Sequence, residues 1–515
     1  MSKHILSKST FMYGCQCEKR LFLCKFRPEL RNPEDERKQA ILESGTNVGL
    51  LARDLFKGGD DASPPDFYSY DKSIAKTKKL IESGAKVIYE AAFQFNEVMC
   101  ALDILVKKKD KWYAYEVKGS TSVKEQYVQD AALQYHVITN SGLELEDISI
   151  VYLNNEYKRI GELVIKQLFN VESVLEPVIE RQDSITEKIE ELKAMLSLGK
   201  EPQVDIGPHC SDPFGCDFTE HCWQGFPKEN NIFSLAYGPG WKLYDEGFKH
   251  LDDIPEGYPL SKRPAMQLEY YRSGNTHIDK EAISEFLGDF HYPLYFFDFE
   301  SVQPAVPEFD HSRPYQQIPF QFSLHIKRKP DFKLEHHSFL GDGVNDPREA
   351  LIGEMITLLG HKGTIIGWSI AFEKTRISEL AEDFPKYKKQ LLAFNERMVD
   401  LIVPFRSRSY YHPDFEGSAS IKNVLPVLVP ELSYSALDIQ EGGTASLVYS
   451  QLKFQDEGTR LVQCQQLLDY CCLDTLAMVR IWEKLGTLER PEVSRKNKWL
   501  NPDDGFGKME NGVVD

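Results

Sequence analysis

LYFFDFES, residues 294–301, decides the fold of the second half of the chain. The run is short and almost entirely apolar, which predicts a buried strand. Asp298 and Glu300 stand two positions apart in it, so their side chains point to the same face of that strand. Two carboxylates side by side on an apolar strand are costly unless a cation neutralises them. The stretch therefore predicts oxygen ligands for a hard divalent ion such as Mg²⁺.

An α/β pattern surrounds this strand. Apolar runs predict two further strands, a helix, another strand and a long final helix, at 319–326, 334–340, 349–360, 363–369 and about 461–485. Glu373 falls at the start of a helix that follows the last of these strands. Tyr470 and Asp474 lie four residues apart on the final helix and therefore share one helix face. The pattern predicts one α/β domain over residues 291–489.

In this order the residues resemble the motifs of the DEDD exonuclease superfamily, which includes the proofreading exonucleases and RNase D. Asp298 and Glu300 match the first motif, Glu373 matches the acid of the second, and Asp474 matches the acid of the third. Tyr470, four residues before Asp474, marks the tyrosine subclass. The resemblance implies an RNase H-like fold and 3′–5′ exonuclease activity.

The resemblance further implies a two-metal site in which Tyr470 orients the attacking water. Four acids would hold Mg²⁺ or Mn²⁺: Asp298, Glu300, Glu373 and Asp474. Two positions depart from the pattern, because the second acid is Glu rather than Asp and Ser369 stands where the motif has Asn. Asp400 resembles a helix-start acid that follows the second motif, and a capping or packing role is its alternative.

A second α/β pattern fills the first half of the chain. We expect three strands, a helix, another strand and a long charged amphipathic helix, at 87–93, 98–106, 112–119, about 123–139, 148–154 and 172–198. Asp103 lies in the second strand, and Glu116 and Lys118 form an E-V-K in the third. Two carboxylates there can converge on a metal, while the lysine adds positive charge near an attacked phosphate.

This order resembles the PD-(D/E)xK nucleases, closest to the RecB-like group that includes CRISPR-associated nucleases with an iron–sulfur cluster. The resemblance implies a restriction-endonuclease-like domain over residues 1–225. Asp103 and Glu116 would hold Mg²⁺ or Mn²⁺, and Lys118 would lie beside the phosphate. Glu90, on the neighbouring strand, is another candidate acid.

Two features of this half match the RecB-like group only in part. Gln134 and Tyr135 lie in the helix where that group carries a Gln/Tyr motif, but they are adjacent rather than spaced. Gly49 stands where members often carry a histidine that would complete the metal site. The alternative is therefore a retained fold that binds DNA without cutting it.

Five cysteines fall into two groups that lie far apart in the sequence. Cys210, Cys216 and Cys222 are evenly spaced in HCSDPFGCDFTEHCW, and Cys15 and Cys17 lie near the start of the chain. One early and three late cysteines resemble the iron–sulfur arrangement of the same RecB-like group. The resemblance implies a [4Fe–4S] cluster on Cys17, Cys210, Cys216 and Cys222, with Cys15 as the alternative first ligand.

Zn²⁺ is the alternative occupant of these cysteines. His209 and His221, which flank the late cysteines, could then take part. The remaining cysteines, Cys472 among them, are expected to be buried thiols.

The composition is that of an ordinary globular protein with a strong negative charge. A formal net charge of −18 argues against a basic surface over the whole chain, although a local basic groove can still track phosphates. The start of the chain lacks an apolar core of signal-peptide length, and no apolar run is long enough to span a membrane. We therefore expect a cytoplasmic protein without a membrane partner, whose cysteines are ligands or thiols rather than disulfides.

The whole arrangement resembles a bacterial family that fuses a RecB-like cluster domain to a DEDD-type domain. We expect an α/β multidomain protein with four parts: a restriction-endonuclease-like domain at 1–225, a helical connector at 226–290, an RNase H-like domain at 291–489 and a loosely ordered tail at 490–515. The expected activity is metal-dependent hydrolysis of DNA. The alternatives are an RNA-processing 3′–5′ exonuclease and a non-catalytic nucleic-acid-binding scaffold. Protein partners are unknown from the sequence.

Overall fold

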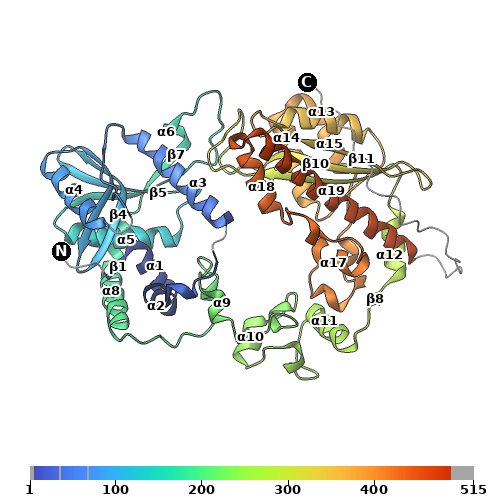
Figure 1. The fold of residues 1–515 in the computed structure, drawn as a ribbon, viewed down its shortest axis with the longest axis horizontal. Helices are drawn as coiled ribbons and strands as arrows, with labels where there is room; N and C mark the ends of the chain where they lie inside the picture. Colours follow the sequence, from blue (N-terminus) through green and yellow to red (C-terminus); the bar gives the residue numbers. More distant parts are fainter. Residues whose placement is uncertain (1–4, 34–35, 67–68, 489–515) are drawn as a thin grey trace.

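The computed structural model describes residues 5–33, 36–66 and 69–488, so the predicted tail at 490–515 lies outside the described residues. The chain is a mixed α/β protein with several sheets. One large sheet lies in each half, and the segment between them runs along one side of the molecule (Figure 1). No helix in the described part is long and apolar enough to cross a membrane.

The N-terminal half is built on a seven-stranded sheet with the order β2-β3-β4-β5-β6-β7, and β1 pairs with β4. The bounds are β1 (Leu6–Ser7), β2 (Asp60–Asp61), β3 (Val87–Phe95), β4 (Val98–Lys108), β5 (Lys111–Lys118), β6 (Leu145–Leu153) and β7 (Phe169–Ser173). β3, β4 and β5 are antiparallel neighbours, whereas β5 and β6 are parallel. The strands predicted at 87–93, 98–106, 112–119 and 148–154 are all present.

Helices cover this sheet. Their bounds are α1 (Lys8–Gln16), α2 (Glu18–Phe26), α3 (Glu36–Ala52), α4 (Tyr70–Glu82), α5 (Glu125–Asn140), α6 (Ile165–Leu168), α7 (Leu175–Glu180) and α8 (Gln182–Ser197). Buried residues of α5 and α8 pack on one face in the larger apolar cluster, and α3 packs on the other. The single helix predicted at 172–198 is wrong, because residues 169–173 form β7 and the helix is interrupted at Arg181.

The C-terminal half is built on a five-stranded sheet with the order β11-β10-β9-β12-β13. The bounds are β9 (Leu294–Val302), β10 (Ile318–Lys327), β11 (Glu335–Leu340), β12 (Thr364–Gly367) and β13 (Met398–Asp400). β10 is antiparallel to both β9 and β11, whereas β12 is parallel to β9 and β13. LYFFDFES therefore forms the central strand of this sheet.

Side chains alternate between the two faces of β9. Phe296 faces a cluster that includes buried residues of α17, α18 and α19, whereas Phe297 and Phe299 face α13, α14 and α15. The helices are α13 (Arg348–Leu359), α14 (Ala371–Asp383), α15 (Lys388–Glu396), α16 (Val403–Arg406), α17 (Ile421–Leu428), α18 (Gly442–Gln451) and α19 (Glu457–Thr487). Because Asp298 and Glu300 share the face of Phe296, they point toward α19.

The connecting segment, residues 226–290, combines short helices with turns and one short strand. It contains α10 (Gly240–Asp245), α11 (Lys262–Ser273), β8 (His277–Ile278) and α12 (Lys280–Gly288), with β8 paired to β14 (Tyr410–Tyr411). α10 ends at Asp245, and a short 3₁₀ turn, Leu251–Asp253, follows before α11.

The loop between β9 and β10 joins the two halves. Arg159, from the N-terminal half, donates hydrogen bonds to the carbonyl oxygens of Pro307 and Glu308, at 3.1 and 2.8 Å. The hydroxyl of Tyr315 donates to the carbonyl oxygen of Gly119, next to the E-V-K strand. On its other side the loop is tied to the C-terminal half by buried Arg348, which donates to the carbonyl oxygen of Asp310 at 2.6 Å.

Candidate functional sites

Three of the predicted acids meet between the central strand and the final helix. One carboxylate oxygen from each of Asp298, Glu300 and Asp474 lies within 4.8 Å of the other two. β9 supplies the first two acids from one face, and α19 supplies the third as it crosses that face. Oxygen ligands gathered in this way suit a hard divalent cation.

Burial and mutual repulsion shape the charge of this site. Burial, followed by the charges of Asp474, Glu373 and Glu300, raises the pKa of Asp298 well above its usual value. Burial and then Asp474 raise the pKa of Glu300 to about 8. Burial raises the pKa of Asp474 to about 6. Without a cation, part of this cluster therefore holds protons at neutral pH.

Glu373 lies beside this group without being one of the three convergent oxygens. It lies near the start of α14, close enough for its charge to raise the pKa of Asp298 and Glu300. Burial raises its own pKa to about 7, and its Oε2 is buried without a hydrogen-bond partner among the described residues. An unpartnered carboxylate oxygen in this position fits a further metal ligand.

Asp400 has a structural role. Its Oδ1 accepts the backbone N–H of Ser369 at 2.8 Å and that of Ile402 at 3.3 Å. Ser369 has a φ of +64°, so the hydrogen bond from its N–H supports a left-handed turn between β12 and α14. Asp400 thus holds the turn that presents Glu373, and its charge contributes to the raised pKa of Glu373.

Tyr470 lies on α19, one helical turn before Asp474. It is buried, and its hydroxyl lies near enough to Asp474 to lower the pKa of that carboxyl. Two neighbours were not identified from the sequence. The hydroxyl of Tyr434 donates to Oδ1 of Asp474 at 2.5 Å, and the charge of Lys422 lowers the pKa of Glu300 and Asp474. Neither residue belongs to a motif, so no local pattern could have revealed them.

A cavity of about 570 Å³ includes in its lining Lys422, whose charge reaches Glu300 and Asp474. Lys422 and Ser369, which adjoin the acidic site, form part of its lining. Trp368 and Tyr237 provide aromatic walls, and Arg406 adds positive charge. Tyr237 comes from the connecting segment, and its side chain is 73% exposed.

The E-V-K site of the N-terminal half has a different charge balance. Oε1 of Glu116 accepts from the ammonium groups of Lys118, at 2.8 Å, and Lys8, at 2.7 Å. Lys118 also donates to Asp130. Two lysines thus face two carboxylates, and they hold the pKa of Glu116 well below its usual range despite its burial. Lys8 and Asp130 were not identified from the sequence.

The other acids of this half lie around the same pair of strands. Oδ2 of Asp103 accepts the backbone N–H of Val117 at 2.6 Å. Burial and the charge of Glu116 raise the pKa of Asp103 to about 8. Glu90 is paired with Arg53 at 3.1 Å rather than with the E-V-K lysine.

The Gln/Tyr pair also has partners within the protein. The side chain of Gln134 is fully buried, and its amide donates to Asp130 at 3.4 Å. Asp130 also accepts from Lys118, so Gln134 and Lys118 share this partner. Tyr135 packs against the apolar cluster of this half. Gly49, in α3, has open space where a side chain would begin.

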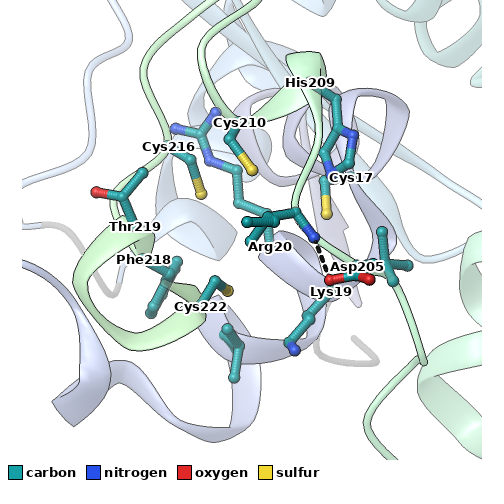
Figure 2. Close-up of a pocket in the computed structure, with 13 residues that line it drawn as sticks. Cys17, Lys19, Arg20, Asp205, His209, Cys210, Cys216, Phe218, Thr219 and Cys222 are labelled. Carbon is teal, nitrogen blue, oxygen red and sulfur yellow. Dashed lines mark hydrogen bonds between the residues drawn. The ribbon is translucent and has the colours of Figure 1, made fainter. Parts of the chain in front are cut away.

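The four cysteines Cys17, Cys210, Cys216 and Cys222 line one cavity (Figure 2). Cys17 caps the start of α2, and Cys210 and Cys222 end a short 3₁₀ turn and α9 (Thr219–Cys222), respectively. His209 lines the same cavity, whereas Cys15 does not and lies 3.9 Å from the amide of Gln129. The geometry therefore selects Cys17 over Cys15 as the partner of the three late cysteines.

Four cysteines form a donor set that both tetrahedral zinc and a [4Fe–4S] cluster use. Tetrahedral Zn²⁺ with Zn–S bonds of about 2.3 Å brings its sulfurs to about 3.8 Å of one another. No three of these four described cysteines have sulfurs within 4.8 Å of one another. A [4Fe–4S] cluster binds each thiolate through a different iron, so it spans a wider set of sulfurs.

We expect manganese to stabilise the C-terminal half more at high pH than at low pH. Because the folded carboxyls have raised pKa values, the folded chain binds more protons than the unfolded chain from about pH 4 to about pH 8, and stability without metal falls as pH rises. A cation binds the ionised carboxylates and offsets this loss. The increase in melting temperature with Mn²⁺ should therefore be larger near pH 8.5 than near pH 6.

Two variants make this measurement specific. Asp298→Asn should remove most of the manganese effect, whereas Asp414→Asn, at an acid whose side chain is 75% exposed, should leave it unchanged. A manganese effect of equal size at both pH values would contradict the expectation.

Comparisons with known proteins identify relatives without a described activity. A family described as "Domain of unknown function (DUF2779)" matches residues 295–420. That span contains Asp298, Glu300 and Glu373 and ends before α17. The chain is also 27% identical over 206 residues to "Uncharacterized protein MG366 homolog" of Mycoplasma pneumoniae, an alignment that covers 36% of this chain and 31% of that protein. The chain thus spans about a third of the length of this curated relative.

Proposed function

We propose that this protein is a metal-dependent nuclease that degrades DNA from the 3′ end at its C-terminal site. The observation that carries the proposal is the convergence of Asp298, Glu300 and Asp474 within 4.8 Å. Tyr470 beside Asp474 supports the match to the tyrosine subclass of DEDD exonucleases. Bound Mg²⁺ or Mn²⁺ would supply charge stabilisation for phosphodiester hydrolysis.

The fold assignments belong to the same proposal. An order of β11-β10-β9-β12-β13, with three antiparallel strands followed by two parallel ones, supports an RNase H-like domain. In the first half, three antiparallel strands, a helix and a parallel strand support a PD-(D/E)xK domain. We take the boundaries at 225, 290 and 489 from the sequence.

The side chains of the C-terminal site would have different roles in hydrolysis. The three convergent acids and Glu373 would hold the cations. The hydroxyl of Tyr470, which lies near enough to Asp474 to lower its pKa, would orient a water molecule for attack. Lys422 contributes positive charge near Glu300 and forms part of the cavity lining. A developing negative charge on a phosphate would be stabilised by such a lysine.

The neighbouring cavity supports a single nucleic-acid strand as substrate. Bases stack on aromatic side chains, and cations track the backbone. Trp368 and Tyr237 offer such surfaces, while Arg406 and Lys422 offer the charge. A volume of about 570 Å³ lies within the range of small-ligand pockets.

We propose that the N-terminal half binds DNA and contributes little to hydrolysis. Lys8 and Lys118 already neutralise Glu116 and Asp130, so burial of these acids does not depend on a divalent ion. At the C-terminal site Lys422 compensates only in part, so the pKa values of Asp298 and Glu300 stay raised, and in the first half only that of Asp103 is raised in the same way beside the lysine-paired Glu116. The charge balance therefore favours the C-terminal half as the hydrolytic site.

Asp298→Ala should lower degradation of end-labelled single-stranded DNA by at least about 100-fold, because the variant loses a metal ligand. Lys118→Ala should retain most of the activity. A 5′ label should show stepwise shortening that stops with EDTA, and an RNA of the same sequence tests the RNA alternative. Loss of activity in Lys118→Ala but not in Asp298→Ala would assign hydrolysis to the N-terminal half. Inactivity of the wild type with Mn²⁺ on both substrates would favour a scaffold.

Tyr237→Ala should raise the KM for single-stranded DNA about tenfold, with kcat little changed, because one base would lose its stacking partner. Phe454→Ala is the matched control, since that ring is 77% exposed and does not line the cavity. Equal KM values for Tyr237→Ala and the wild type would exclude the cavity as the strand-binding site.

We also propose that Cys17, Cys210, Cys216 and Cys222 hold a [4Fe–4S] cluster, which would tie α2 to the segment after α8. Protein purified without oxygen should contain about four irons per chain. Cys17→Ser should lose most of this iron, and Cys15→Ser should keep it, because Cys15 lies outside the cavity. Stoichiometric zinc without iron in the wild type would contradict the cluster.

A further inference from the structure

A second group of metal-ligand side chains lies between β10, β11 and α19, apart from the proposed nuclease site. One ring nitrogen of His325, one of His336 and the sulfur of Cys472 lie within 4.8 Å of one another. His325 and His336 are directly opposite in the antiparallel pair, and their ring centroids are 4.5 Å apart. Cys472 comes from α19, which packs across these strands.

Each histidine is oriented through one nitrogen. Nδ1 of His325 lies 2.8 Å from the hydroxyl of Thr475, and Nε2 of His336 lies 3.0 Å from the hydroxyl of Ser323. The two hydroxyls are themselves hydrogen-bonded at 2.7 Å. The described residues provide no hydrogen bond to the other nitrogen of either ring. Metal-binding histidines are commonly held in this way, with one nitrogen fixed by a partner and the other free for the ion.

We propose that His325, His336 and Cys472 bind one Zn²⁺ ion in a site separate from both the acids and the four-cysteine cavity. Two imidazoles and a thiolate suit zinc and do not suit Mg²⁺. Binding would convert the thiol of Cys472 to a thiolate, with its proton released to solvent. The fourth position would be taken by water, because three protein ligands leave a tetrahedral ion one open position.

A metal ion can reach this site from the surface of the protein. His336 and Cys472 are only partly buried, whereas His325 is 5% exposed and forms the inner wall. The expectation that Cys472 is a buried thiol is therefore wrong, since α19 leaves it at the edge of the sheet. The adjacent Cys471 is fully buried and points into the protein.

A zinc ion bound here would also help to hold Asp298 and Asp474 in position. Thr475 follows Asp474 on α19, and Ser323 lies directly opposite Asp298 in the sheet. An ion that joins β10 and β11 to α19 would therefore fix the helix against the strands beside the acids. The role is structural, and zinc here would raise the melting temperature of the C-terminal half.

The test is a metal titration of the full chain after chelator treatment. Wild-type protein should bind one more equivalent of Zn²⁺ than Cys472→Ser and one more than His336→Asn. With Co²⁺ the same equivalent should carry a thiolate-to-cobalt absorption band that both variants lack. Cys464→Ser is the matched control, because Cys464 lies on α19 and is partly buried but is not part of the group.

Circular dichroism establishes that each variant is folded before it is titrated. Two variants, Cys472→Ser and His336→Asn, are used so that a folding defect in one of them does not decide the result. Loss of one equivalent in both variants, with Cys464→Ser unchanged, supports the site. Equal zinc stoichiometry in wild type, Cys472→Ser and His336→Asn overturns it. Loss of the same equivalent in Cys464→Ser also overturns it, because the ion would then lie elsewhere on the helix.

Discussion

The packing of α19 against the acid-bearing face of β9 is the constraint on which the C-terminal half depends. It buries Asp298, Glu300 and Asp474 in one space with a wall of aromatic residues, where like charges repel strongly. The protein can meet this cost by keeping protons on the acids or by binding a cation. A fold that was selected only for stability would have placed apolar side chains at these three positions.

The two acidic sites of the chain offset the cost of buried carboxylates in different ways. In the N-terminal half, Lys8 and Lys118 reach Glu116 and make the buried group close to neutral. In the C-terminal half, Lys422 lowers the pKa of Glu300 and Asp474 without offsetting their burial. A site with its own ammonium groups has less need of a divalent ion, whereas a site with uncompensated carboxylates attracts one.

The halves are also mechanically connected. The loop that leaves the central strand after Glu300 contacts Arg159 in the first half, and buried Arg348 anchors it in the second. Tyr315, in the same loop, reaches the backbone at Gly119, immediately after the E-V-K lysine. The loop after β9 thus contacts both halves of the protein. A movement of one half would therefore displace the other.

The sequence by itself determined the strands and the order of the acids, because burial of alternate residues and motif spacing are local properties. It predicted β9 with Asp298 and Glu300 on one face, and Tyr470 with Asp474 on one helix face, and both are present. Only the tertiary structure decided that Cys17 rather than Cys15 joins the late cysteines, that Lys8 pairs with Glu116, and that Tyr434 binds Asp474. These partners lie tens to hundreds of residues apart, and no local pattern records a contact that forms only when distant elements pack together.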